Sequence, residues 1–433
     1  MSSGEVAAVM FGTFGVLIFL RVPVSFALGL ACVPVFFFDD RLTPILLITE
    51  MWKSYNAFVL LSVPFFLLAA NLMNAAGITD RLVNLARALV GHLPGGLAHV
   101  NVLVSMLFAG ISGSSTADAA GIGSLMIPAM KKQGYDVSFS VAITACSSVM
   151  GVIIPPSIMM IVWGGLMSVS IGGLFLAGVV PGVLMALLMM GTVLVYAKRR
   201  GYPIYQRATM AELLRAVGEA FLALVTPAII VGGIVGGLFT PTEASVVAVI
   251  YSALLGCLVY RSIGAMELPK VLYESARFAS ISLFCIGTAS AFGWLLAYYR
   301  IPQSLVEVVS VWGTGRTGTG FLIALAFLFV GMFIDAIPAI IVVGTVFLPL
   351  AQQVGMHPIH FAMIGVISLA FGLVTPPYGL CLLISCSLGE IKMVEALKDV
   401  GIVLVPMLVL LILVVVFPDL VLFLPRLLTP KLL

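Results

Sequence analysis

Long, uninterrupted apolar runs constrain this chain more than any other feature of its sequence. Of its 433 residues, 62% are hydrophobic and only 9% are charged. Soluble domains carry about 25% charged residues, so a soluble enzyme, a disordered chain and a secreted disulfide scaffold are all excluded. Lipid admits only helices and closed barrels, because the backbone must pair internally. The runs are too long and continuous for barrel strands, which predicts an all-α polytopic membrane protein.

A bilayer-spanning helix needs about 20 apolar residues, and that length divides the chain into three kinds of segment. Probable full spans cover 5–20, 22–38, 58–76, 173–197, 221–239, 243–260, 278–298 and 401–424. Short amphipathic pieces cover 41–57, 79–90, 206–219, 262–276 and 300–312. Segments 97–131 and 318–351 are each too long for one helix and predict helical hairpins. Segments 137–168 and 359–388 carry a central Pro-Pro, which splits a helix because proline lacks a backbone donor.

These irregular segments form two matching pairs. Seven positions recur at a constant offset of 221: Gly110, Gly123, Pro128, Gly134, Gly151, Pro155 and Pro156 become Gly331, Gly344, Pro349, Gly355, Gly372, Pro376 and Pro377. The pattern predicts two repeats, 1–197 and 221–433, joined by a cytoplasmic connector at 198–220. The first repeat would hold spans within 1–76, an arm at 79–90, hairpin 97–131, broken helix 137–168 and span 173–197. The second would hold spans within 221–298, an arm at 300–312, hairpin 318–351, broken helix 359–388 and span 401–424.

The basic residues predict the orientation. With both termini outside the cytoplasm, 15 of the 21 Lys and Arg residues lie in cytoplasmic loops, as the positive-inside rule favours. Each half then crosses the membrane an odd number of times, so the two repeats have inverted topology and the two hairpins are re-entrant from opposite sides. Paired broken helices in inverted repeats are typical of secondary transporters, whose sites lie where helix halves meet.

The tip of the first hairpin carries a polar cluster at membrane depth. It reads Ser112-Gly113-Ser114-Ser115-Thr116-Ala117-Asp118. Hydroxyls and free carbonyls are oxygen ligands that suit a small cation, while the start of the following helix suits an anion. The alternative is that these residues only cap the helix. One residue suffices for a cap, whereas buried polar clusters in a bilayer are costly and usually functional.

The second tip and the two helix breaks extend this prediction to a pair of ion sites. Asp335 lies at the offset position of Ser114, and it could both cap a helix and bind an ion. Unwinding at each Pro-Pro frees backbone carbonyls. The first predicted ion site contains Ser112, Gly113, Ser114, Ser115, Gly151, Ile154 and Pro156. The second contains Gly331, Phe333, Asp335, Gly372, Thr375 and Pro377.

Other conspicuous residues favour structural roles. Thr240-Pro241-Thr242-Glu243 has the spacing of a capping box with proline at the first helical position, and Lys198-Arg199-Arg200 suits an interface anchor. The net charge of +3 indicates no nucleic-acid partner. The six cysteines lie in apolar segments without metal-ligand spacing, so no disulfide, redox or metal site is predicted: Cys32, Cys146, Cys257, Cys285, Cys381 and Cys386.

Together these motifs resemble the large membrane subunit of tripartite ATP-independent periplasmic (TRAP) transporters. The resemblance covers essentially the whole chain and rests on the 112–118 tip, Phe239-Thr240-Pro241-Thr242-Glu243-Ala244, the two Pro-Pro pairs and Arg21-Val22-Pro23. It implies sodium-driven symport of an organic acid by an elevator motion. The hairpins, the broken helices and their flanking spans would move as a transport domain, and the remaining spans with the amphipathic arms would form a scaffold.

The resemblance also implies surroundings and partners. These are the bacterial inner membrane, a small membrane subunit of about four spans, and a soluble periplasmic binding protein that delivers a carboxylate. Sodium would be the coupling ion, with no other cofactor. The predicted substrate-binding residues are Ser115, Thr116, Asp118, Ser157, Pro338 and Tyr378.

Other functions are weighed against this one. An intramembrane hydrolase would need a base near the serines of 112–115, and no His or Lys lies close in sequence. A passive channel could use inverted half-helices, but the paired ion sites favour alternating access. A single-component sodium/carboxylate symporter of the same superfamily is the alternative within the transporter class.

Overall fold

The computed structural model describes residues 3–39, 41–310 and 315–430, and its regular elements there are all helical. The last two residues of the predicted arm at 300–312 lie outside these ranges. The first half forms α1 (Ser3–Phe19), α2 (Val24–Phe38), α3 (Ile45–Tyr55), the 3₁₀ turn η1 (Phe58–Leu61), α4 (Ser62–Ala75), α5 (Ile78–Val90), α6 (Gly96–Ser112), α7 (Ser115–Lys132), α8 (Val137–Ser148), α9 (Met150–Ile153), α10 (Ile158–Met167) and α11 (Ile171–Arg200).

The second half repeats much of this order. It forms α12 (Met210–Val235), α13 (Pro241–Leu254), the π-helical turn η2 (Leu255–Val259), α14 (Leu268–Tyr298), α15 (Ile301–Ser310), α16 (Arg316–Gly331), α17 (Ala336–Gln353), α18 (Pro358–Gly372), α19 (Leu380–Gly389), α20 (Met393–Val416) and α21 (Asp419–Leu428). An offset of 221 carries α7 onto α17 at both ends and α10 onto α19 within one residue. The sequence repeat therefore has a structural counterpart in helix boundaries.

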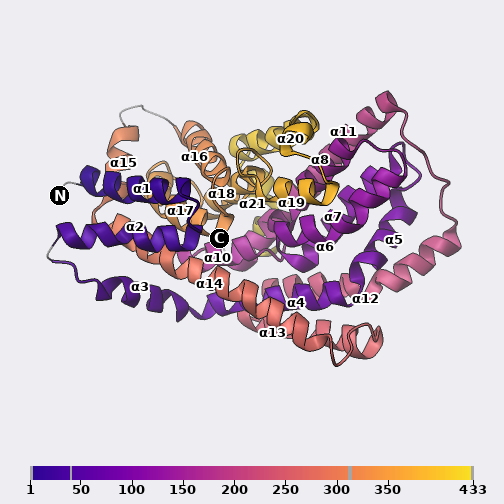
Figure 1. The fold of residues 1–433 in the computed structure, drawn as a ribbon, viewed down its shortest axis with the longest axis horizontal. Coiled ribbons are helices and arrows are strands. Elements are labelled where there is room, and N and C mark those ends of the chain that lie inside the picture. Colours follow the sequence, from indigo (N-terminus) through magenta and orange to yellow (C-terminus); the bar gives the residue numbers. More distant parts are fainter. Residues whose placement is uncertain (1–2, 40, 311–314, 431–433) are drawn as a thin grey trace.

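The two halves interlock rather than forming separate domains. Helix α13 packs against α4, α14 packs against α2 and α3, and α19 packs against α7 and α8. In Figure 1, α3, α4, α13 and α14 lie along the lower part of the molecule, and α6–α8 with α16–α20 lie above them. Trp163 from the first half packs against Phe327 and Phe361 from the second, with ring centroids 5.4 and 5.3 Å away.

The helices fit a polytopic membrane protein. Within the described residues, eight helical stretches are long and apolar enough to cross a membrane: Phe58–Ala75, Val137–Met167, Ile171–Arg200, Met210–Val235, Pro241–Val259, Leu268–Tyr298, Ala336–Gln353 and Met393–Val416. The predicted spans 5–20 and 22–38 form shorter apolar helices of 17 and 15 residues. Arg21-Val22-Pro23 separates them, and α2 begins directly after Pro23.

Two of the amphipathic pieces, 206–219 and 262–276, are continuous with the spans that follow them, because α12 and α14 each run on into the following span. No glycine or proline interrupts the chain between 219 and 226 or between 270 and 286, so each helix propagates once started. The capping box of Thr209 and Glu212 starts α12 inside the predicted connector. Between α11 and α12 only residues 201–209 are non-helical, so the predicted connector 198–220 includes the end of α11 and the start of α12.

Candidate functional site

Both hairpin tips open onto one cavity of about 350 Å³. The first hairpin, α6–α7, contributes Gly113 to Thr116, and the second, α16–α17, contributes Asp335 to Ile337. Five pairs of lining residues are related by the offset of 221: Ser114 and Asp335, Ser115 and Ala336, Thr116 and Ile337, Val152 and Leu373, Met159 and Leu380. The two halves therefore present equivalent positions to the same cavity.

Four helices begin at this cavity. The first residues of α7, α10, α17 and α19 all line it: Ser115, Ile158, Ala336 and Leu380. Helix N-termini carry unpaired N–H groups and a partial positive charge. No Lys or Arg is among the described lining residues, and Asp335 is their only charged side chain. An anion in this cavity would therefore be held by backbone N–H groups and hydroxyls rather than by cationic side chains.

The first tip is joined to the Pro155-Pro156 break by backbone contacts. The Ile158 amide donates to the Gly113 carbonyl at 3.2 Å. Gly113 has φ +63°, and a methyl group added there would lie 2.8 Å from the Pro156 carbonyl oxygen. A methyl group at Gly151 would lie 3.0 Å from the Ser114 carbonyl oxygen. Glycine at both positions permits this close approach.

Asp118 lies within the same cluster. Its side chain is fully buried, and one carboxylate oxygen accepts from the Ser112 hydroxyl. The other oxygen, Oδ2, has no partner and would lie 2.7 Å from a methyl group at Gly151. A buried carboxylate oxygen without a partner is costly. Together with the Ser112 hydroxyl and the nearby Ser114 carbonyl, it provides oxygen donors of the kind that bind a hard cation.

The second tip contacts its own break in a similar way. Gly331 and Gly372 pack backbone to backbone, and a methyl group at Gly372 would lie 2.6 Å from the Gly331 carbonyl carbon. The Tyr378 amide donates to the Met332 carbonyl at 3.0 Å. Asp335 precedes α17 and accepts from the Ala336 amide at 2.8 Å. Its side chain is exposed to the cavity, so the predicted cap exists and leaves carboxylate lone pairs free.

The remaining residues of the two predicted ion sites are less uniformly placed. The Ile154 side chain packs against Gly182 of α11. Phe333 is 42% exposed and packs against Phe329. Pro377 is exposed. The Thr375 hydroxyl donates to the Phe371 carbonyl at 2.7 Å. Across the described ranges no three His, Cys, Asp or Glu side chains gather as a metal site, so a cation here would rely on hydroxyl, carbonyl and single carboxylate oxygens.

The six predicted substrate-binding residues divide into two groups. Ser115 and Thr116 line the cavity, and the buried Ser115 hydroxyl has no hydrogen-bond partner. Ser157 caps α10 and donates to the Val152 carbonyl at 2.7 Å. Asp118, Ser157, Pro338 and Tyr378 are not among the lining residues, although the first three are buried nearby in sequence and Tyr378 is 43% exposed.

One wall of the cavity was not predicted from the sequence. Leu67 of α4 and Phe278, Ile281 and Ser282 of α14 face the tips across the cavity. Their spacing in α14, i, i+3 and i+4, marks one face of a helix. In an apolar span, however, the same spacing is found in residues that face lipid or the protein core. The sequence alone therefore does not show that these residues line a cavity.

The two motifs assigned structural roles behave differently. Thr240 and Glu243 form the predicted capping box, which is confirmed, with the Glu243 carboxylate accepting from the Thr240 amide at 2.8 Å. Arg200 does more than anchor a helix end: it pairs with Asp136 and lies 3.5 Å from Asp399. Hydrogen bonds from Tyr202 and Arg200 lower the pKa of Asp136.

A polytopic helical fold with a cavity between paired hairpin tips is typical of membrane transporters. Residues 11–420 match the family described as "Tripartite ATP-independent periplasmic transporter, DctM component". The chain belongs to this family, the large permease subunits of TRAP transporters, and is a transporter component rather than an enzyme.

Relatives with stated substrates align over most of their length. The chain is 36% identical to the sialic acid TRAP transporter large permease protein SiaM of Vibrio cholerae, over 96% of this chain and 98% of that protein. It is 36% identical to the C4-dicarboxylate TRAP transporter large permease protein DctM of Pseudomonas aeruginosa, over 87% and 88%. The fold is similar to that of the YdaH transporter of Alcanivorax borkumensis, with a TM-score of 0.61 at 15% identity over 86% and 88% of the chains.

Proposed function

We propose that this permease performs sodium-coupled uptake of an organic acid across the bacterial inner membrane. The observation that carries the proposal is the single cavity onto which both hairpin tips and four helix N-termini open. The partial positive charge at the N-termini of four helices suits a carboxylate. The named substrates of SiaM and DctM, sialic acid and C4-dicarboxylates, are carboxylates of this kind.

Asp335 provides a physical reason for coupling. Its carboxylate faces the cavity and would repel an anionic substrate, because the described lining residues include no cationic side chain to offset it. A sodium ion bound at Asp335 would neutralise this charge and add a favourable partner for the substrate. Sodium would then bind before the substrate, and the substrate's apparent affinity would rise with sodium concentration.

The first sodium ion would bind at the opposite tip. The unpaired Asp118 Oδ2, the Ser112 hydroxyl and the Ser114 carbonyl lie together behind the cavity wall. These groups fit a small cation better than a substrate, so we place Asp118 in the first ion site and Ser115 and Thr116 at the substrate. Gly331, Gly372 and Asp335 would shape the second ion site.

The conformational change that opens the cavity to each side of the membrane in turn would be of the elevator type. We propose that the repeats 1–197 and 221–433 have inverted topology with both termini periplasmic. The hairpins, broken helices, α11 and α20 would move against a scaffold formed by α1–α5 and α12–α15. Leu67 and Phe278 would then belong to the fixed wall, so that sliding the tips past them opens the cavity to one side at a time.

Two partners complete the proposal. A tripartite system implies a small membrane subunit and a soluble periplasmic binding protein in addition to this subunit. The decisive experiment reconstitutes the permease with both partners in liposomes and imposes an inward sodium gradient. Uphill uptake of labelled sialic acid or a C4-dicarboxylate that disappears with potassium in place of sodium supports the proposal. Uptake without the binding protein would indicate a single-component symporter, and gradient-independent equilibration would indicate a channel.

A further inference from the structure

A groove between α11 and α20 has an apolar interior and a cationic end. It measures about 540 Å³. One face of α11, from Leu188 to Arg200, forms one wall, and Ile402 and Pro406 of α20 form the other. Both helices are long and apolar enough to cross a membrane. None of the residues that line this groove lines the cavity at the hairpin tips.

The α11 wall is a single face of the helix. Leu188, Thr192, Val195 and Arg199 line the groove and follow one another at intervals of three or four residues, so they lie on the same side of α11. From Leu188 to Arg199 this face is about 16 Å long at 1.5 Å per residue. That length is close to the depth of one leaflet, half of a hydrocarbon core of about 30 Å. The Arg199 side chain therefore lies at headgroup level when the rest of the face lies among acyl chains.

Gly191 leaves the middle of this face open. It is exposed, and a methyl group added there would have no atom within 4 Å. Val195, one turn further along α11, is 57% exposed, and Leu188 and Ile402 are half-buried. The hollow is therefore bounded by apolar side chains that remain accessible to an acyl chain.

Three consecutive cations end α11, and they outnumber the acids beside them. Arg200 pairs with Asp136 and lies 3.5 Å from Asp399. Arg199 lines the groove, is exposed and has no carboxylate partner among the described residues. Lys198 is exposed and also has no carboxylate partner there, but it does not line the groove. An anion in the groove would therefore meet the charge of Arg199 without a competing carboxylate.

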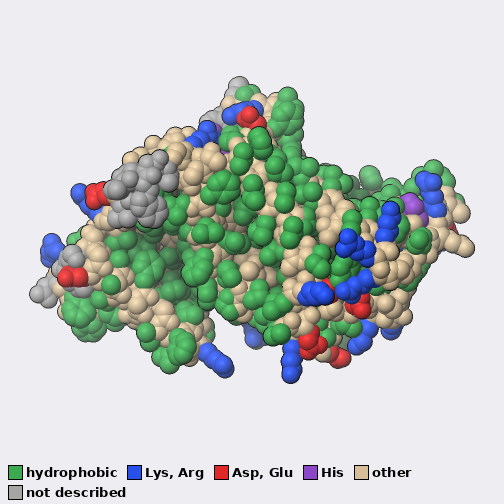
Figure 2. All heavy atoms as spheres, turned by 90° about the horizontal axis from the view of Figure 1, so that it is seen from above, with side chains coloured by type: hydrophobic (Ala, Val, Ile, Leu, Met, Phe, Trp, Pro, Cys, Tyr) green, Lys and Arg blue, Asp and Glu red, His purple; other side chains and the backbone are tan. Residues whose placement is uncertain are grey.

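Two further features indicate that this end of α11 lies at the membrane surface. Tyr196 and Tyr202 flank the three cations in the sequence, and tyrosine is enriched where the membrane meets water. Lys and Arg side chains gather over the end of the molecule that holds α5, α11 and α12 (Figures 1 and 2). Such a cationic surface beside apolar helices is typical of a boundary with lipid headgroups.

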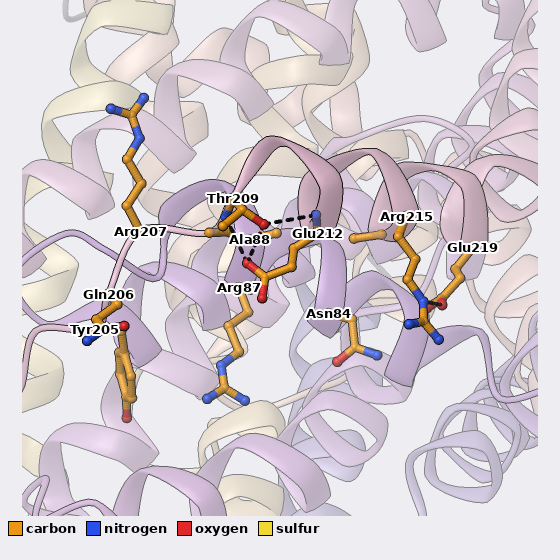
Figure 3. Close-up of a pocket in the computed structure, with 12 residues that line it drawn as sticks. Asn84, Arg87, Ala88, Tyr205, Gln206, Arg207, Thr209, Glu212, Arg215 and Glu219 are labelled. Carbon is orange, nitrogen blue, oxygen red and sulfur yellow. Dashed lines mark hydrogen bonds and ion pairs between the residues drawn. The ribbon is translucent and has the colours of Figure 1, made fainter.

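A larger cavity of about 740 Å³ at the same end of the molecule is less suited to an anion. It is formed by α5, the connector before α12 and the first turns of α12. Arg215 pairs there with Glu219 at 3.0 Å, and Glu212 carries a charge opposite to that of Arg87. Figure 3 shows Arg207 pointing away from the other side chains that line this cavity. Its charges therefore offset one another, whereas the described residues that line the α11–α20 groove include no acid.

We propose that the groove between α11 and α20 binds one anionic phospholipid, with the Arg199 guanidinium at its phosphate and an acyl chain along the wall from Val195 to Leu188. Arginine binds phosphate through paired N–H donors, and basic pockets beside membrane helices recognise anionic headgroups. A zwitterionic lipid has the same phosphate and chains but brings a second cation close to Arg199, so the charge of the headgroup distinguishes the two. The inference does not depend on the transported substrate or on sodium coupling.

The test measures lipid binding to the full-length permease purified in detergent. Phosphatidylglycerol and phosphatidylcholine are titrated separately, and the bound lipids are counted by native mass spectrometry, with inorganic phosphate as a competitor. We expect phosphatidylglycerol to bind more tightly and Arg199→Gln to weaken its binding about fivefold, as for the loss of one basic residue near an anionic headgroup. Lys198→Gln removes the same charge from the neighbouring residue, which does not line the groove. It is the matched control and should change the affinity little.

A second pair of variants tests the apolar wall. Gly191→Leu would fill the groove, and nothing within 4 Å obstructs the start of the added side chain, so both lipids should bind more weakly. Gly218→Leu adds the same side chain to α12 outside the groove, again with nothing within 4 Å, and should leave both affinities unchanged. Both variants should fold, because leucine favours a helix more than glycine does.

Several results would overturn the proposal. Equal binding of the two lipids would show that headgroup charge plays no part, and equal losses in Arg199→Gln and Lys198→Gln would show that the position of Arg199 plays none. Unchanged binding in Gly191→Leu would place the lipid elsewhere. Inorganic phosphate that displaces phosphatidylglycerol completely would make the site one for a soluble anion. Loss of the small membrane subunit from Gly191→Leu, without a change in lipid binding, would assign the groove to a protein interface.

Discussion

Ser114 and Asp335 occupy equivalent positions 221 residues apart, each directly before the second helix of a hairpin, and both line one cavity. The two side chains differ in charge. Ser114 offers a neutral hydroxyl that accepts from the Ala117 amide at 3.4 Å, whereas Asp335 brings a carboxylate into a cavity whose other described lining residues are uncharged. The two sides of the cavity are therefore electrostatically unequal.

Asp335→Asn tests this inequality. Asparagine caps helices about as well as aspartate, so the substitution removes the charge and leaves the start of α17 intact. We expect the sodium concentration for half-maximal uptake to rise roughly tenfold, as for the loss of a hydrogen-bonding charged partner. Glu243→Gln is the control, because glutamine can complete a capping box and Glu243 lies outside the cavity. Equal shifts in both variants would remove Asp335 from the ion site.

Sodium binding at both tips predicts how the uptake rate depends on sodium concentration. If each hairpin tip holds at least one ion, the initial uptake rate should rise sigmoidally with sodium concentration. The measurement is uptake at saturating binding protein over a range of sodium concentrations at constant ionic strength. Asp118→Asn should reduce the sigmoidicity, because it alters the first ion site while sparing Asp335. A hyperbolic dependence in the unmodified protein would contradict the two-site arrangement.

Gly372→Ala tests the contact between the second hairpin and its helix break. The added methyl group would lie 2.6 Å from the Gly331 backbone, so the two segments must separate, at a cost of about 1–3 kcal/mol typical of overpacking. Thermal unfolding in detergent should show a lower midpoint, and uptake should fall. Gly218→Ala in α12 is the control, because nothing lies within 4 Å of the added atom. It should stabilise the helix by about 0.5–1 kcal/mol.

The Asp136 ion pair predicts a pH dependence of stability. Hydrogen bonds from Tyr202 and Arg200 hold the folded-state pKa of Asp136 below its usual value. The stabilisation is therefore present above the unfolded pKa of about 4 and is lost as the pH falls below it. Unfolding midpoints between pH 3 and pH 6 should fall more steeply in the unmodified protein than in Asp136→Asn. Glu274→Gln, an exposed carboxylate of α14, should leave the slope unchanged.

Single cysteines at Ser114 and Ala336 report access to the cavity. Both residues line it, so in one conformation a membrane-impermeant thiol reagent should reach both from the same side. With the six native cysteines replaced, sodium and loaded binding protein should transfer the labelling of both sites to the other side. Labelling that proceeds from both sides under all conditions would indicate an open pore.

The helix boundaries were largely predictable because local signals set them. The double prolines locate both breaks, Thr240 and Glu243 locate the start of α13, and the offset of 221 relates α7 to α17. The joined helices α12 and α14 were not predictable, because a change from amphipathic to uniformly apolar sequence marks a change of surroundings and not the end of a helix.

The cavity was only half predictable. Polar tip residues are conspicuous in apolar sequence, so Ser115 and Thr116 could be found. Phe278 and Ile281 look like any other span residues, and their place depends on how α14 packs against the rest of the fold. Asp118 is conspicuous in the sequence because it is charged, but the sequence does not indicate where its side chain lies. In the fold the side chain lies near Gly151 and does not line the cavity.

Helix α14 joins the amphipathic piece at 262–276 to the span at 278–298. It is 31 residues long, about 46 Å at 1.5 Å per residue, and it carries Phe278, Ile281 and Ser282 of the cavity wall. Residues 268–277 lie in the same helix as this part of the wall, so a partner that binds them and shifts α14 would change the width of the cavity while touching none of its lining.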